Sequence, residues 1–198
     1  PYADVRVLFE QDRAEQALAA LENHPAQGTP EWYALKGHAL TLQGRFNEAT
    51  EAFEEALAGG LAPDDEPYLI PDLLEGMDRR EAWANKELFE KQIGEEGIDA
   101  LLDATENIRY WLRWNAVHVL RALGAEDRID DCQVYILDLL HAGSCRTRRQ
   151  AAVKLAQVGD ERALEPLTRA KDRSEDHNDC MDDTLDEAIR AIRARTAE

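Results

Sequence analysis

Two pairs of histidine and cysteine are the residues in this sequence best suited to holding a metal ion. His141 lies four positions before Cys145, and His177 lies three positions before Cys180. Two imidazole nitrogens and two thiolates form a common kind of tetrahedral zinc site. The first pair, however, straddles an Ala-Gly step at the expected end of a helix, and the second lies in an acidic loop, whereas zinc sites usually have paired ligands at short spacing. We therefore expect unrelated surface residues and no bound metal, and zinc binding stays open as the alternative.

The sequence contains no catalytic motif. Neither the G-x-S-x-G pattern of hydrolases nor a phosphate-binding glycine loop occurs in it. The polar, acidic loop expected at 172–183 lacks the spacing and the glycine of a calcium-binding EF-hand. Carboxylates are plentiful, but nothing singles out a catalytic pair. We therefore expect a protein that is not an enzyme and carries no cofactor, and an enzyme with a site built between repeats is the third hypothesis.

The cysteine content and the apolar pattern bear on location. Cys132, Cys145 and Cys180 are an odd and sparse set, which argues against a disulfide framework and suits a reducing cytosol. We expect three free thiols and a cytoplasmic protein. No window approaches eighteen apolar residues, and nothing at the start resembles a secretory signal. Because the chain begins at Pro1 without a methionine, we expect that a targeting segment or a whole domain can precede it.

The charge balance limits the choice of partner. The chain holds 41 Asp and Glu against 23 Lys and Arg, a formal net charge of -18. A field of this sign repels phosphate backbones and anionic lipid surfaces, so we expect neither nucleic acid nor a membrane as partner. Residues 1–77 hold 15 acidic and 4 basic side chains, so most of the arginine lies further along. The acidic surface either keeps the protein soluble or attracts a basic partner.

The helix expected at 108–123 carries the residues best suited to binding a partner. Its apolar positions are Leu112, Ala116, Leu120 and Leu123. If these face the core, another face presents four residues at i, i+4, i+8 and i+11, namely Tyr110, Trp114, His118 and Arg121. Trp and Arg are often dominant in binding interfaces because they bury a large area and keep polar contacts. The spacing therefore predicts a partner-binding stripe.

The stripe continues in a second segment. The stretch NAVHVLRALG is echoed thirty-five positions later by QAAVKLAQVG, which puts Arg149 beside Trp114, with Arg146 nearby. The candidate partner-binding residues are thus Tyr110, Trp114, His118, Arg121, Arg146 and Arg149. The alternative is structural: Trp111 or Trp114 wedges between repeats, and the arginines pair with neighbouring acids.

Helices must position these residues, because helical patterns run through almost all of the 198 residues. Apolar residues recur at three- and four-residue spacing, Ala, Leu and Glu are abundant, and the alternation typical of strands is absent. The predicted helices span 4–10, 12–23, 30–43, 46–58, 79–93, 95–105, 108–123, 129–141, 146–157, 161–171 and 183–196. The predicted fold class is therefore all-α.

Glycine, proline and a charge run mark an expected domain boundary at 59–66, GGLAPDDE. The segment after it, YLIPDLLEGM, contains Pro71 and can form only a broken or brief helix. We expect helical repeats of one kind over 1–62, a linker with a short helix over 63–78, and helical repeats of another kind over 79–198.

The segment WYALKGHALTLQGRFNEATEAFEEAL resembles a tetratricopeptide repeat. The 34-residue unit of that family alternates aromatic and small residues at fixed steps, because two antiparallel helices pack closely only where small side chains face large ones. Those positions hold Tyr33, Gly37, Gly44, Ala49, Phe53 and Ala56. Leu40 replaces the usual second aromatic residue of the first helix. Upstream, DRAEQALAALENHP is similar to the second helix of a degenerate preceding unit.

The echoed stretch resembles a different helical repeat, the HEAT-like type found in phycobilisome lyases and in many bacterial multidomain proteins. Its features are an Arg or Gln, a small pair, a Leu and a Gly, followed by a turn with Asp160 and Arg162. Arg113 and Arg148 also correspond, and LDEAIRAIRAR is a third, weaker copy. No pocket motif supports a lyase chromophore site.

Together the two resemblances imply a helical-repeat solenoid, tetratricopeptide-like and then HEAT-like, in which each unit buries its face on the next. We expect a non-catalytic protein-interaction scaffold or adaptor for a protein or peptide, of the kind frequent in bacterial signalling proteins. The alternative is an acidic inhibitor or immunity-type protein that masks a basic toxin or nuclease.

Overall fold

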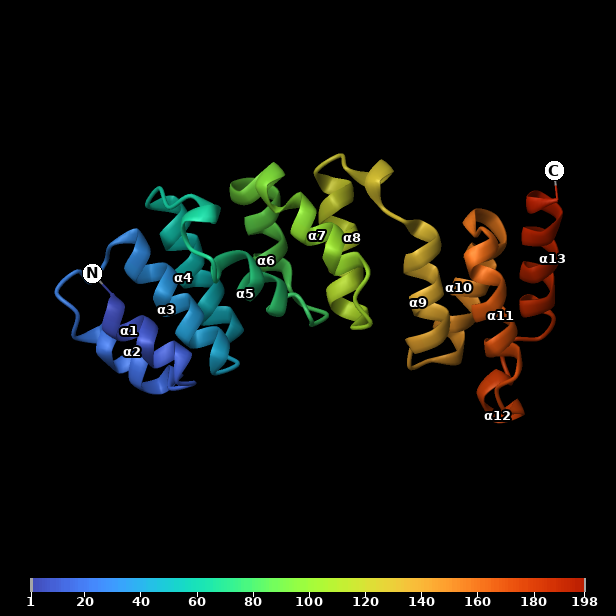
Figure 1. Ribbon diagram of the computed structural model, residues 1–198, viewed down its shortest axis with the longest axis horizontal. Helices are drawn as coiled ribbons and strands as arrows, with labels where there is room; N and C mark the ends of the chain where they lie inside the picture. The colour runs from blue at the N-terminus through green and yellow to red at the C-terminus, as the bar shows by residue number, and fades with distance from the viewer. Residues whose placement is uncertain (1, 198) are drawn as a thin grey trace.

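The computed structural model describes residues 2–197, apart from the side chains of Glu175 and Asp176. All regular secondary structure in these residues is helical, which confirms the all-α prediction. The helices form an elongated row with the N-terminus at one end and the C-terminus at the other (Figure 1). Every helix in the described part of the chain is too short or too polar to cross a lipid bilayer.

The helices follow the predicted order, except that a short helix, Glu175–Asn178, lies in the segment predicted as a polar loop, 172–183. The first five are α1 (Ala3–Glu10), α2 (Ala14–Glu22), α3 (Pro30–Leu42), α4 (Phe46–Ala58) and α5 (Leu69–Glu75). The others are α6 (Trp83–Leu88), α7 (Ile98–Thr105), α8 (Tyr110–Ala122), α9 (Asp131–His141), α10 (Cys145–Val158), α11 (Leu164–Lys171), α12 (Glu175–Asn178) and α13 (Thr184–Thr196). Short 3-10 turns lie at Pro63–Asp65, Gly94–Gly97, Glu126–Arg128 and Glu161–Ala163, and a π turn lies at Phe89–Ile93.

Helices α3 and α4 pack as the tetratricopeptide resemblance implies. A Cβ atom at Gly37 would lie 2.5 Å from Cε1 of Phe53, so only glycine lets the buried phenyl ring approach the backbone this closely. Gly44 follows α3 with a φ of 72°, a left-handed conformation that costs glycine little. The predicted pairing of small and large residues is therefore confirmed here.

Helix α5 lies in the segment predicted as a linker, yet it packs into the central core. Leu69 and Leu73 are fully buried, and the core cluster to which they belong runs from Leu40 to Val134. Pro71 lies in the first turn of this brief helix, where its missing amide donor is tolerated. The core thus crosses the boundary expected at 59–66, and the division into domains stays a prediction.

A separate core cluster is formed mainly by helices α9, α10, α11 and α13. The echoed pairs are buried in both copies, namely Ala116 with Ala151 and Leu120 with Leu155. The two echoed positions require glycine for different structural reasons. Gly124 has a φ of 72°, whereas a Cβ atom at Gly159 would meet the carbonyl oxygen of Leu155 at 2.6 Å. The two copies therefore resemble each other more in which residues are buried than in the backbone conformation of the glycine.

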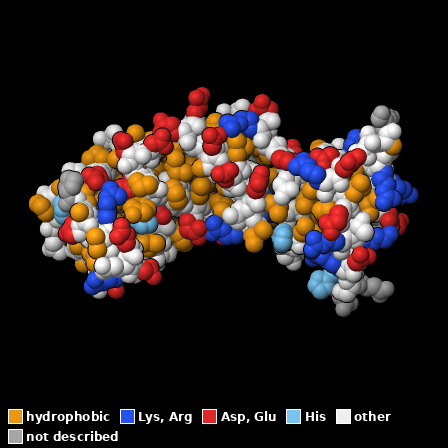
Figure 2. Space-filling model, viewed as in Figure 1, with side chains coloured by type: hydrophobic (Ala, Val, Ile, Leu, Met, Phe, Trp, Pro, Cys, Tyr) orange, Lys and Arg blue, Asp and Glu red, His pale blue; other side chains and the backbone are white. Residues whose placement is uncertain are grey.

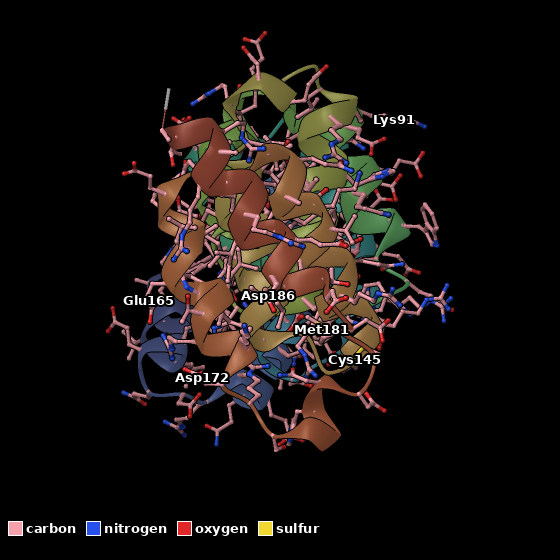
Figure 3. The ribbon with its side chains drawn as sticks, turned by 90° about the vertical axis from the view of Figure 1, so that its right-hand side faces the viewer. Lys91, Cys145, Glu165, Asp172, Met181 and Asp186 are labelled. Atoms are coloured by element: carbon pink, nitrogen blue, oxygen red, sulfur yellow. A yellow bond between two sulfur atoms is a disulfide. The ribbon has the colours of Figure 1, made fainter. Side chains whose placement is uncertain are left out.

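Cys145 and Cys180 form a disulfide, with their Cα atoms 6.0 Å apart. The prediction of free thiols is therefore wrong for these two residues and is confirmed for buried Cys132. The bond ties the start of α10 to the end of the predicted loop 172–183, which contains α12 and lies at the lower edge of the C-terminal helices (Figure 3). Because the pairing depends on how this loop folds back, the spacing of the cysteines did not reveal it. The cytoplasmic location loses the support of free thiols and stays a prediction.

Candidate interaction site

Helix α8 is oriented by its apolar face. Leu112, Ala116 and Leu120 are buried in the central core, as predicted, and Leu123 is half-buried at its edge. Trp114 is half-buried at the edge of the same core cluster, on the side of α8 that contacts α9.

A single buried carboxylate joins α8 to α9. Asp138, which is 3% exposed, accepts a hydrogen bond on Oδ1 from the guanidinium of Arg113 and another on Oδ2 from Nε1 of Trp114, at 2.9 Å. Arg113 is completely buried and also donates to the carbonyl oxygen of Asn107. A buried ion pair of this kind holds its geometry because breaking it would leave an uncompensated charge away from water.

A cleft of about 700 Å³ opens where α8, α9 and α10 meet. Its aromatic lining consists of Tyr110, Trp114 and Tyr135, and its basic lining consists of Arg146, Arg149 and Lys154. The ring of Trp114 lies 5.8 Å from that of Tyr135 and 6.4 Å from that of Tyr110, centroid to centroid. The basic side chains are exposed to solvent, whereas Asp138 lies buried at the inner side. The cleft thus combines apolar surface with exposed positive charge.

The two tyrosines of the cleft remain neutral phenols around neutral pH. Burial raises the pKa of Tyr110, and the nearby Asp138 carboxylate raises it further. Burial likewise raises the pKa of Tyr135, with Asp131 as the next cause. Both hydroxyl groups therefore keep their protons, so each offers a hydrogen-bond donor to a molecule in the cleft.

The structure brings four of the six predicted binding residues to this cleft: Tyr110, Trp114, Arg146 and Arg149. The other two lie outside its lining. His118 is exposed, with Nε2 3.8 Å from the carboxylate of Glu90, and Arg121 lies 3.7 Å from Asp131. Trp114 of α8 and Arg149 of α10, which the 35-residue echo pairs, both line the cleft, whereas the later residues of the stripe on α8 lie outside it. Partner binding by any of the six stays a prediction.

Some contacts also support the structural alternative, in which Trp114 packs between helices and the arginines pair with neighbouring acids. Arg149 lies 3.3 Å from the carboxylate of Asp182, and Trp114 is bonded to Asp138. The Arg149 pair is exposed on both sides, and such pairs contribute little stability. A charged ligand can therefore replace Asp182 at small cost.

Among the residues of the cleft that sequence reasoning missed are Tyr135, Asp138 and Lys154. One signal was present, because Asp138 interrupts the apolar run YILDLL in α9. An acid in such a run is buried in most registers of the helix, and a buried acid needs a partner. Which arginine supplies it depends on how α8 packs against α9.

The zinc alternative loses its ligands. The disulfide uses the sulfur atoms of both Cys145 and Cys180, so neither is available as a thiolate. Asp179 lies close to the two sulfur atoms, but a lone carboxylate adds no metal site to a disulfide. His177 lies with Nδ1 2.8 Å from the hydroxyl oxygen of Ser174.

The fold and the cleft together define an all-helical repeat protein with a candidate binding groove. Residues 5–69 match the family model of the tetratricopeptide repeat-like domain, which supports the resemblance found in the first helices, α1 to α4. Domains of this kind generally bind proteins or peptides and are typically non-catalytic. No significant match was found among curated proteins or among solved structures. The HEAT-like assignment of the later helices stays a prediction.

Proposed function

We propose that this chain is a non-catalytic interaction scaffold or adaptor that binds a protein or peptide in the cleft between α8, α9 and α10. The observation that carries the proposal is the joint lining of the cleft by aromatic rings and exposed basic side chains. Trp, Tyr and Arg dominate the energetics of many interfaces because they bury large areas while keeping polar contacts. The tetratricopeptide-like match at residues 5–69 supports a general role in protein interaction.

The cleft also suggests what kind of segment it binds. Exposed Arg146, Arg149 and Lys154 attract a carboxylate, whereas Trp114 and Tyr135 suit an apolar or aromatic side chain. The best-matched ligand is therefore a peptide segment that carries an aromatic residue next to an acidic one. The site is fixed in shape by the Asp138 bonds, which limits the ordering cost of binding.

The test is capture of partners from a lysate of the source organism at low and high salt, followed by mass spectrometry. The cleft variant is Trp114→Ala with Arg149→Glu. A control applies the same chemical changes at two exposed residues outside the cleft, as Trp83→Ala with Arg128→Glu. We expect a partner held by the wild type and by the control at both salt concentrations, and lost from the cleft variant. A partner that the cleft variant keeps would contradict the proposal, provided that thermal melts show both variants folded.

A second candidate function has its own observation. A groove of about 440 Å³ on the α3–α4 pair is lined by four glutamates, Glu48, Glu51, Glu54 and Glu55. Together with the excess of acid in residues 1–77, this groove favours a basic partner, as an inhibitor of a basic toxin or nuclease would need. Glu51→Lys with Glu54→Lys then abolishes capture of one basic protein, and high salt releases that protein from the wild type. Capture that is insensitive to both changes would exclude this candidate.

A further inference from the structure

A second cavity, of about 560 Å³, lies on the other side of the start of α10, between the end of α9 and the polar loop. Its lining consists of Ala142, Gly143, Arg148, Arg173, Ser174 and His177. None of these residues lines the cleft described above. Two of the six are arginines, and both are withdrawn from solvent: Arg148 is 7% exposed, and Arg173 is half-buried.

The two arginines are held in place by the backbone. The guanidinium of Arg148 donates to the carbonyl oxygen of His177, and Nη2 of Arg173 donates to the carbonyl oxygen of Leu140 at 2.7 Å. Among the side chains that the structure describes, neither arginine forms an ion pair with a carboxylate. Burial lowers the pKa of Arg173, and the positive charge of Arg148 is the next cause. Two like charges therefore share one cavity, an arrangement that a bound anion stabilises.

In the preceding copy of the echoed sequence, a buried acid neutralises the corresponding arginine. Arg148 corresponds to Arg113 in the thirty-five-residue echo, and Arg113 is neutralised by buried Asp138. Thirty-five positions after Asp138 stands Arg173. The acid of one copy is thus replaced by a base in the next, which converts an internal ion pair into a pair of arginines.

We propose that this two-arginine cavity is a binding site for an oxyanion, a phosphate or carboxylate group carried by a ligand. Guanidinium groups suit such ligands because their planar N–H donors match two oxygens at once. The hydroxyl group of Ser174 and the ring of His177 add polar contacts at the edge of the cavity. The proposal concerns a different cavity from the interaction cleft, and it stands whether or not that cleft binds a peptide.

Basic residues are frequent in α10 and α11, although the loop beside the cavity is acidic. Residues 141–173 contain eight Lys and Arg against four Asp and Glu, and residues 174–183 contain five Asp and Glu and no Lys or Arg. Figure 2 shows Lys and Arg side chains over the C-terminal helices on one face. The two arginines of the cavity, rather than the net charge of the region, therefore supply the attraction for an anion.

The test is a thermal melt of the full chain at constant ionic strength, with sodium chloride replaced stepwise by inorganic phosphate or by acetate. We expect phosphate to raise the melting temperature by about 3–5 °C at ten times its Kd, because it binds only the folded state. A larger shift with phosphate than with acetate assigns the site to phosphate groups, and the reverse assigns it to carboxylates. Equal melting temperatures in all three salts would overturn the proposal.

Two variants separate this cavity from general charge effects. Arg173→Asp places an acid at the position that corresponds to Asp138 in the thirty-five-residue echo and removes one positive charge from the cavity. We therefore expect it to fold, to melt no lower than the wild type and to lose the response to phosphate and acetate. Arg128→Asp makes the same change of charge at an exposed arginine that pairs with Asp99, away from the cavity, and it keeps the response. A wild-type response in Arg173→Asp, or its loss in Arg128→Asp, would mean that the anion binds elsewhere.

Discussion

Trp114 donates its indole N–H to Oδ2 of Asp138 across 2.9 Å, and this bond spans the junction of α8 and α9. The other oxygen of the same carboxylate accepts from the buried guanidinium of Arg113. One acid therefore fixes both the aromatic wall of the cleft and the charge balance of the junction. The central core cluster reaches α9 through Val134, whereas Cys132, Ile136 and Leu139 of α9 belong to the second cluster, so this polar contact supplements what apolar packing provides at the junction.

Asp138→Ala is expected to lower the free energy of unfolding by about 3–5 kcal/mol, because it leaves the Arg113 guanidinium buried without a counter-charge. Urea denaturation measures this loss. The double variant Arg113→Met with Asp138→Leu removes both charges and is expected to recover most of it. Equal losses in the single and double variants would show that the ion pair has no special role.

Gly37→Ala is expected to destabilise the protein by about 1–3 kcal/mol, because the new Cβ would lie 2.5 Å from the Phe53 ring. Gly44→Ala is the matched control. Its Cβ would meet no atom within 4 Å, so it pays only about 1–2 kcal/mol for the left-handed backbone. Adding Phe53→Leu should reduce the cost of Gly37→Ala and leave that of Gly44→Ala unchanged. Thermal melts of Gly37→Ala, Gly44→Ala, Phe53→Leu and the two double variants check this non-additivity.

Acid is expected to weaken the contact that Arg162 makes between the 3-10 turn Glu161–Ala163 and the residue before α9, Asp130. Its guanidinium lowers the pKa of Asp160 to about 2 and also lowers that of Asp130, since it bonds to both carboxylates. The ionised acids favour the folded state, so their contribution is fully present above about pH 4 and is lost as the pH falls towards 2. All three side chains are partly exposed, which keeps the effect below about 1 kcal/mol.

The measurement is the difference in melting temperature between the wild type and Arg162→Met at several pH values from 7 to 3. We expect the wild type to be more stable at pH 7 and the difference to shrink below pH 4. Arg169→Met, which removes an exposed arginine of similar size, serves as the control and should give a small difference that changes little with pH. A difference in melting temperature between the wild type and Arg162→Met that stays constant with pH would contradict the prediction.

Reduction of the Cys145–Cys180 disulfide is expected to lower the free energy of unfolding by roughly 2–4 kcal/mol, because the bond restricts the unfolded chain over a separation of 35 residues. Urea denaturation with and without dithiothreitol measures the change. The variant Cys145→Ser with Cys180→Ser should resemble the reduced wild type and should not respond to reductant. A wild type that is equally stable in both buffers would sink this prediction.

Most helices could be predicted because their apolar spacing is a local property. The helix expected at 46–58 is α4, Phe46–Ala58, with the same bounds. The region 89–97 differs, since a π turn and a 3-10 turn replace regular helix there. Glycines permit this local packing: a Cβ atom at Gly97 would lie 2.8 Å from the Phe89 ring, and Gly94 has a φ of 61°. Neither fact can be read from spacing alone.

The candidate site could be predicted in part for the same reason. The echo places Trp114 near Arg149 because residues at equivalent positions of adjacent repeats lie side by side. Asp138 was missed because its role depends on how α9 is rotated against α8. The disulfide was missed because it depends on the course of a loop, for which the sequence carries no periodic signal.

Cys145 and Cys180 also close a covalent ring of chain that contains α10, α11 and α12. A protease that cuts once inside this ring, for example in the polar loop, leaves two pieces that the sulfur bridge still holds together. The last helix also stays bound to α10, since Arg195 donates to the carbonyl oxygens of Ala156 and Gly159. A nicked molecule would therefore migrate as one species on a gel until reductant divides it in two.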